Sequence, residues 1–260
     1  MMHLSIFAVS SVMVLCIHYL KSNFPNLIEH PSSDIRKVHN TGVIRIGGII
    51  FFSIFITCFY LRDPLHISII IFSFLVLAVG LIEDVYRNFS KYYRLFILGL
   101  LCCLFVINNN FIVLDFDSYY LNYFFNTNFY FKLFFSIFGL LLLINAFNFV
   151  DGLNGLLLGI SLIILGSFAF YASSHISNIN ILIYALIIPT LILFCFNFFG
   201  GRILSGDSGS YFLGFMIGAI SINMSNYNIL ESFELKGFSL RSYHNNKFLA
   251  FGDLLHKIHP

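Results

Sequence analysis

Apolar segments of nearly membrane-spanning length follow one another through most of this 260-residue chain. A helix needs about 20 mostly apolar residues to cross a bilayer core, because each residue adds only about 1.5 Å. By this measure eight segments qualify, over residues 3–20, 46–61, 65–82, 94–107, 129–147, 155–172, 179–196 and 210–224. The composition agrees, since 58% of the residues are hydrophobic and only 10% are charged. The sequence therefore predicts an integral membrane protein.

The apolar segments show no strict alternation of apolar and polar residues. A transmembrane β-barrel would show such alternation in segments of about ten residues, so strands are not expected. We predict an all-α fold, a polytopic bundle with about eight transmembrane helices. The membrane domain, with its cytoplasmic catalytic loops, is expected over residues 1–224. A polar C-terminal tail, either truncated or disordered, is expected over residues 225–260.

Basic residues are distributed unequally between the two predicted sides of the membrane. If the N-terminus faces out, the inner loops hold Lys21, Arg36, Lys37, Arg45, Arg87, Lys91, Arg94 and Arg202, and the outer side up to the last span holds only Arg62 and Lys132. Since basic residues are retained on the cytoplasmic side, this orientation is favoured. The tail breaks the rule, because four basic residues follow the eighth span. The formal net charge of +2 gives no reason to expect a nucleic-acid partner.

Four carboxylates stand at the ends of apolar segments, all on the side assigned to the cytoplasm. They are Glu83, Asp84, Asp151 and Asp207. Ionised groups in such positions are costly unless they face a polar cavity or a cation. We therefore expect these acids, which come from three separate loops, to converge on one site.

The residues around these acids are suited to phosphate chemistry. Asn145, Asn148 and Asp151 are spaced three apart and would share one face if the helix continued. A glycine-rich turn runs from Gly200 to Gly209 into the last span, where backbone N–H groups suit phosphate oxygens. Mg²⁺ held by carboxylates would bridge acid and phosphate. The cations available to hold further phosphate charge are Lys37, His39, Arg45, Lys91 and Arg94. These residues predict phosphoryl transfer on a nucleotide or a lipid phosphate at the inner membrane face.

Four ordered segments resemble those of the polyprenyl-phosphate N-acetylhexosamine 1-phosphate transferases, which form glycosyltransferase family 4. The segments are RKVHNTGVIRIGGI at 36–49, GLIEDVYRNFSKYYRL at 80–95, NAFNFVDGLNGL at 145–156 and FNFFGGRILSGDSGSYFLGF at 196–215. The third and fourth together are highly specific.

The resemblance implies a Mg²⁺-dependent enzyme, with Mn²⁺ as an alternative ion. A UDP-N-acetylhexosamine would give its sugar 1-phosphate to undecaprenyl phosphate and release UMP. The other partners implied are the lipid bilayer and a second copy of the chain in a homodimer. The location implied is the bacterial inner membrane, with the active site facing the cytoplasm.

The resemblance also assigns residues by position. Glu83 and Asp84 match the family's acidic pair, which would ligate the metal or deprotonate the lipid phosphate. Asp207 matches the acid that binds Mg²⁺ directly, so Asp84 and Asp207 are the expected metal ligands. The expected catalytic residues are Glu83, Asp84, Asp151 and Asp207, of which Asp151 belongs to the segment on the nucleotide side. The residues expected to bind the nucleotide or the phosphates are Asn148, Asn154, Asn197, Lys37, His39, Arg45 and Arg94.

Two departures from the family pattern leave alternatives open. The acidic pair begins with Glu83 where Asp is common, so the division of roles within the pair is undecided. Family members also carry more spans and a histidine-containing loop near the C-terminus, which His256 and His259 match only loosely. A catalytically incomplete family member is one alternative reading, and a polytopic transporter or flippase is another. The hexosamine and the polymer are not identified.

Overall fold

The computed structural model describes residues 28–29, 43–45, 47–49, 51–52, 64–86, 89–109, 111–113, 128–175, 177–200 and 203–235. Its helices are α3 (Pro64–Val85), α4 (Lys91–Asn109), α6 (Phe129–Val150), α7 (Leu156–His175), α8 (Ser177–Gly200) and α9 (Gly206–Leu235). Its strands are β1 (Ile28–Glu29), β2 (Val43–Arg45) and β3 (Ile203–Leu204). The part of the chain that is described is thus predominantly helical.

Three of the described helices contain segments long and apolar enough to cross a membrane, namely Ile67–Val85, Lys91–Asn109 and Phe129–Val150. Shorter apolar helical segments run over Leu156–Ala172 and Leu182–Phe198. Six of the eight predicted spans coincide with α3, α4, α6, α7, α8 and α9. The predicted spans 3–20 and, for the most part, 46–61 lie outside the described residues, so the count of eight stays a prediction.

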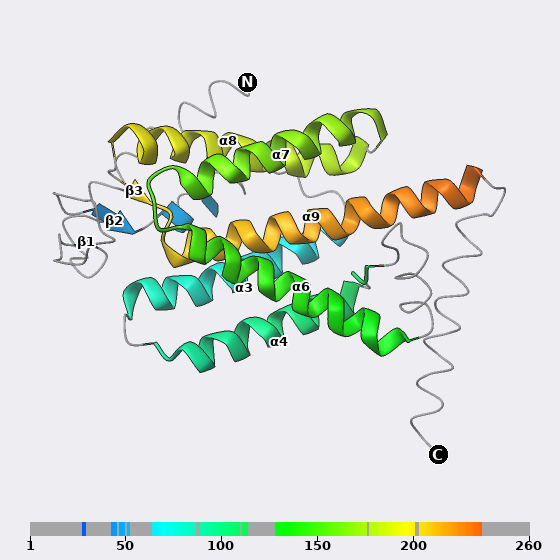
Figure 1. The fold of residues 1–260 in the computed structure, drawn as a ribbon, viewed down its shortest axis with the longest axis horizontal. Coiled ribbons are helices and arrows are strands. Elements are labelled where there is room, and N and C mark those ends of the chain that lie inside the picture. The colour runs from blue at the N-terminus through cyan, green and yellow to red at the C-terminus, as the bar shows by residue number, and fades with distance from the viewer. Residues whose placement is uncertain are drawn as a thin grey trace, which may run out of the picture.

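Helix α9 lies at the centre of the bundle (Figure 1). The α7–α8 pair lies above it in that view, and α3, α4 and α6 lie below it. Every residue from 208 to 220 is buried, so this stretch of α9 contacts protein on all sides. The helix continues to Leu235, past the predicted domain limit at residue 224, while residues 236–260 lie outside the described part. The prediction ended the span at residue 224 because the residues that follow are more polar, but a helix does not need apolar residues to continue.

Glycines allow α9 to approach both of its main neighbours closely. A Cβ at Gly214 would lie 2.8 Å from the Cα of Ile144 in α6, and a Cβ at Gly218 would lie 2.5 Å from a methyl group of Leu140. On the other side, a Cβ at Gly80 of α3 would lie 2.5 Å from the Cα of Ser208. Small residues at such contacts are typical of helix packing in membranes. They fix the register of α3 and α6 against α9.

A small three-stranded sheet corrects the expectation of a fold without strands. Its order is β1-β2-β3, with β1 antiparallel to β2 and β2 parallel to β3. Ile44 pairs with Ile203, and Arg45 pairs with Leu204. Strands of two or three residues carry no recognisable alternation, because the pairing of distant segments decides them. The sheet joins the first sequence motif to the fourth at the end of the bundle where α3 ends and α9 begins (Figure 1).

Substitution of Gly214 by Ala is expected to destabilise the bundle by about 1–3 kcal/mol, because the new methyl group would overlap the backbone of α6. The measurement is the thermal unfolding midpoint of the detergent-solubilised protein. Gly166→Ala in α7 is the matched control, since its Cβ would meet nothing within 4 Å. Equal midpoints for the two variants would contradict the close α6–α9 packing.

Candidate functional site

The carboxylate of Asp84, near the end of α3, binds the first turn of α9. Its Oδ1 accepts the backbone N–H of Asp207 at 2.9 Å, and its Oδ2 accepts the backbone N–H of Ser208 at 3.0 Å. The Ser208 hydroxyl donates a third hydrogen bond to Oδ2 at 2.8 Å. The first N–H groups of a helix lack partners within the helix, and a carboxylate there also interacts favourably with the helix dipole. Asp84 therefore caps α9 from another helix.

Gly206 makes room for this cap. It has a φ of +70°, and a Cβ there would lie 2.8 Å from the Oδ2 of Asp84. Both constraints favour glycine, because other residues rarely adopt this backbone conformation. Asp84 itself is only 1% exposed, so its charge depends on these three donors for compensation.

Asp207, the first acid of α9, is held by Asn148 of α6. The Nδ2 of Asn148 donates to Asp207 Oδ1 at 2.5 Å and to the Ser210 hydroxyl at 3.2 Å. The Asp207 carboxylate also interacts electrostatically with Asp84 and with Arg94. Asp207 is half-buried. It thus lies between one acid, one amide and one cation from three other helices.

Glu83, the neighbour of Asp84, belongs to a separate set of contacts. Its Oε1 accepts a hydrogen bond from Nη1 of Arg94 in α4 at 2.5 Å, which is also an ion pair. Its Oε2 accepts the Tyr211 hydroxyl at 2.7 Å. The Arg94 guanidinium lies 5.9 Å from the centroid of the Tyr211 ring, within the range of a cation–π contact. The two members of the acidic pair therefore have different partners.

The segment after α6 differs from its sequence-based expectation. The helix ends at Val150, and Asp151 is its C-cap, with its N–H bonded to carbonyl oxygens of the last turn. The condition for a shared helical face through residues 145, 148 and 151 is therefore not met, because the helix ends before Asp151. A helix cannot continue easily into Gly152 and Gly155, and Gly155 has a φ of +75°.

Two asparagines expected to bind substrate have different surroundings. Asn154 is exposed in the turn that follows α6. Asn197 of α8 is buried, and its Oδ1 accepts the backbone N–H of Gly155. This bond fixes the turn between α6 and α7 against α8, so Asn197 has a structural contact. Its expected contact with a diphosphate stays a prediction.

Five of the predicted site residues thus lie in one connected region, namely Glu83, Asp84, Arg94, Asn148 and Asp207. Asp151 lies one turn beyond Asn148, at the same end of α6. Arg45 is in β2, where only its backbone is described, and Lys37 and His39 lie outside the described residues. His256 and His259 also lie outside the described residues. The expected homodimer stays a prediction.

Three residues that sequence analysis missed complete the region: Ser208, Ser210 and Tyr211. Tyr211 follows Asp207 by four residues and therefore lies on the same face of α9. That spacing is the signal that could have identified it.

No group of three or more His, Cys, Asp or Glu side chains within the described ranges is arranged to hold a metal ion. A site for Mg²⁺ does not require such a group, because this ion is often bound by one or two carboxylates together with water and substrate phosphates.

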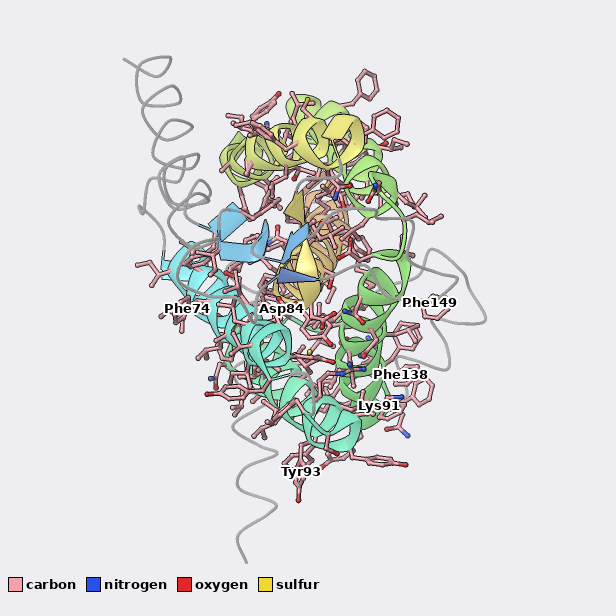
Figure 2. The ribbon with its side chains drawn as sticks, turned by 90° about the vertical axis from the view of Figure 1, so that its left-hand side faces the viewer. Phe74, Asp84, Lys91, Tyr93, Phe138 and Phe149 are labelled. Atoms are coloured by element: carbon pink, nitrogen blue, oxygen red, sulfur yellow. The ribbon has the colours of Figure 1, made fainter. Side chains whose placement is uncertain are left out.

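Figure 2 looks onto the end of the bundle that carries the site. Asp84 lies inside the ring of helices, whereas Phe74, Phe138 and Phe149 lie on its outer side. Phe149 is 90% exposed. Exposed aromatic side chains on the outside of a bundle, with a buried acid on its inside, are the arrangement expected where lipid surrounds the helices.

Comparison with known proteins decides the family. The family described as Glycosyl transferase family 4 matches residues 66–225, a range that includes every member of the connected region. The chain belongs to this family. The match and the apolar helices place the protein in a membrane.

Several curated relatives are similar to most of this chain. A "Probable undecaprenyl-phosphate N-acetylglucosaminyl 1-phosphate transferase" of Bacillus subtilis is 28% identical over 75% of the chain and 54% of its own length. A phospho-N-acetylmuramoyl-pentapeptide-transferase of Dictyoglomus turgidum is 30% identical over 75% and 62%. One of Borreliella afzelii is 29% identical over 70% and 61%. The chain thus spans between about half and two thirds of the length of these relatives.

Replacement of Asp84 by Asn is expected to destabilise the start of α9, because an amide offers one acceptor oxygen where three donors converge. Leaving buried donors unsatisfied costs about 1–3 kcal/mol. The thermal midpoint in detergent is the measurement. Ser208→Ala should lower it less, since only one bond is lost. Ser167→Ala, on the exposed face of α7, is the control. An unchanged midpoint for Asp84→Asn would contradict the capping role.

Proposed function

We propose that this protein transfers an N-acetylhexosamine 1-phosphate from a UDP-sugar to undecaprenyl phosphate, with release of UMP, as the first membrane step of cell-envelope polysaccharide synthesis. The family supports this proposal, and so do the names of the relatives, which include N-acetylglucosaminyl and N-acetylmuramoyl-pentapeptide transferases. Because the chain spans only part of those relatives, the complete activity is proposed here rather than transferred from them.

One structural observation carries the proposal. Three carboxylates and one guanidinium, from α3, α4 and α9, gather at the end of apolar helices. Transfer between two phosphates needs the reactants to be positioned and their charge neutralised, more than it needs a covalent intermediate. A polar region at the end of a membrane helix bundle is accessible to a soluble nucleotide and a lipid phosphate together. The position of the acids at one end gives no support to the transporter alternative.

Mg²⁺, or Mn²⁺ in its place, fits the residues of this region. Three acids, Glu83, Asp84 and Asp207, share this region with Arg94, and a divalent cation would offset the excess of acidic groups. Asp207 is the best placed ligand, because it is half-buried and already oriented by Asn148. Asp84 is a weaker candidate than expected, because both of its oxygens accept hydrogen bonds from α9. When bound, the ion would neutralise phosphate charge.

The remaining residues would bind and orient the substrates. Arg94 offers a planar donor group that matches phosphate oxygens. Asn148 fixes the orientation of Asp207, and Asp84 fixes the turn from which Asp207 projects. The turn that carries Asp151 and Asn154 lies at the same end of the bundle, where it would meet the nucleotide.

The same region supports the proposed orientation in the bacterial inner membrane. Lys91 and Arg94 stand in the first turn of α4, at the end of the bundle where the acids lie. Basic residues at the ends of spans are retained in the cytoplasm. We therefore propose that the site faces the cytoplasm.

The direct test is an exchange assay in membranes with labelled UDP-N-acetylglucosamine and undecaprenyl phosphate, in which UMP release is measured. Asp207→Asn is expected to reduce turnover by about 100-fold or more, because charge stabilisation at the phosphate would be lost. Ser167→Ala should leave turnover unchanged. Unchanged turnover in Asp207→Asn would remove Asp207 from the site. Absence of UMP release from the wild type with a panel of UDP-N-acetylhexosamines would overturn the proposed function.

Removal of divalent ions is a second test of the same proposal. Chelation by EDTA is expected to stop UMP release, and Mg²⁺ is expected to restore it, because the phosphate charges would otherwise remain uncompensated. Turnover that persists after complete chelation would contradict the proposed ion.

A further inference from the structure

Tyr211 is a buried polar residue that neither the sequence nor the proposed function assigns. Its side chain is 0% exposed, and its hydroxyl donates to Glu83 Oε2 at 2.7 Å. The other oxygen of Glu83 accepts Nη1 of Arg94 at 2.5 Å. The three residues come from α9, α3 and α4, so this chain of contacts connects three helices.

Of these three residues, only Arg94 is both partly exposed and able to donate further hydrogen bonds. Its side chain and that of Glu83 keep 20% and 17% exposure, whereas Tyr211 has none. A guanidinium has five N–H donors in a planar fork. Within the described part of the chain, Nε of Arg94 is buried and has no hydrogen-bond partner. An unpaired buried donor costs free energy. A ligand would meet the exposed part of the guanidinium and not this buried atom.

The neighbouring residues fix the position of the guanidinium but occupy only part of its hydrogen-bond donors. Glu83 binds one edge of the group, and the Tyr211 ring lies 5.9 Å from it. Tyr211 in turn restricts Glu83, because a carboxylate that accepts a hydrogen bond on each oxygen cannot rotate freely. Asp207, one turn before Tyr211, adds an electrostatic attraction on Arg94.

We propose that Tyr211 and Glu83 position Arg94 to bind a phosphate group of a substrate. Glu83 is then a positioning residue and not a metal ligand or a base, and the two acids of the pair have separate tasks. This inference rests on the proposed function and deepens it. The bound group is a phosphate oxyanion, and it has two sources, the diphosphate of the nucleotide sugar and the head group of the polyprenyl phosphate.

The inference is tested with Tyr211→Phe in the full chain, because this change removes the hydroxyl and keeps the ring. The KM for one phosphate substrate is expected to rise about three- to tenfold, as for loss of one hydrogen bond, while kcat changes less than about twofold. The substrate whose KM rises identifies the source of the phosphate. Tyr184→Phe, on the exposed side of α8, is the matched control.

A double-mutant cycle separates positioning from simple packing. Glu83→Gln alone and Tyr211→Phe alone should each raise the same KM, and the combined variant should raise it by less than the product of the two effects. Unchanged KM values for both substrates, or effects that multiply independently, would overturn the inference even where the thermal midpoint falls.

Binding of inorganic pyrophosphate, followed by calorimetry in detergent, provides a readout independent of turnover. The wild type is expected to bind it, and Tyr211→Phe to bind it about three- to tenfold more weakly. If the wild type shows no sugar transfer, the proposed function fails, and the binding of pyrophosphate still tests whether Tyr211 positions Arg94. Equal affinities, or no binding by the wild type, would overturn it.

Discussion

The capping of α9 by Asp84 is the interaction on which the rest of the site depends. A buried carboxylate is costly, and the N–H groups at the start of a buried helix are costly as well. Each satisfies the other here, through three hydrogen bonds between α3 and α9. The bonds hold Asp207 and Ser208 at a fixed distance from α3. The contacts of Asn148 with Asp207 and of Glu83 with Tyr211 depend on this placement of α9.

The close packing of the helices makes this cap possible. Gly80 lets the backbone of α9 approach α3, and Gly214 lets α6 approach from the other side. Asn148 can then reach Asp207, and Tyr211 can reach Glu83. A bulkier residue at either glycine would separate the backbones by more than a hydrogen bond tolerates. Packing in the apolar part of the bundle and chemistry at its end are therefore coupled.

The division of the acidic pair follows from the same geometry. Adjacent residues on a helix point in directions about 100° apart, so Glu83 and Asp84 cannot meet the same partners. Asp84 faces the start of α9 and is buried, whereas Glu83 faces α4 and keeps some exposure. The two acids form one motif in the sequence, but in the fold they belong to two sets of hydrogen bonds. One set holds Asp207, and the other holds Arg94.

The sequence by itself determined the apolar helices, the family and the acids that matter, because hydropathy and the cost of charge near lipid can be read one segment at a time. It therefore predicted that Glu83, Asp84, Asp151 and Asp207 converge on one site, and contacts in the structure connect three of these acids, Glu83, Asp84 and Asp207. Only the tertiary structure decided which side chain meets which, the end of α6 at Val150 and the sheet that pairs Ile44 with Ile203. The contact between Tyr211 and Glu83 spans 128 positions of the chain. It depends on the register of two packed helices, and no local pattern encodes that register.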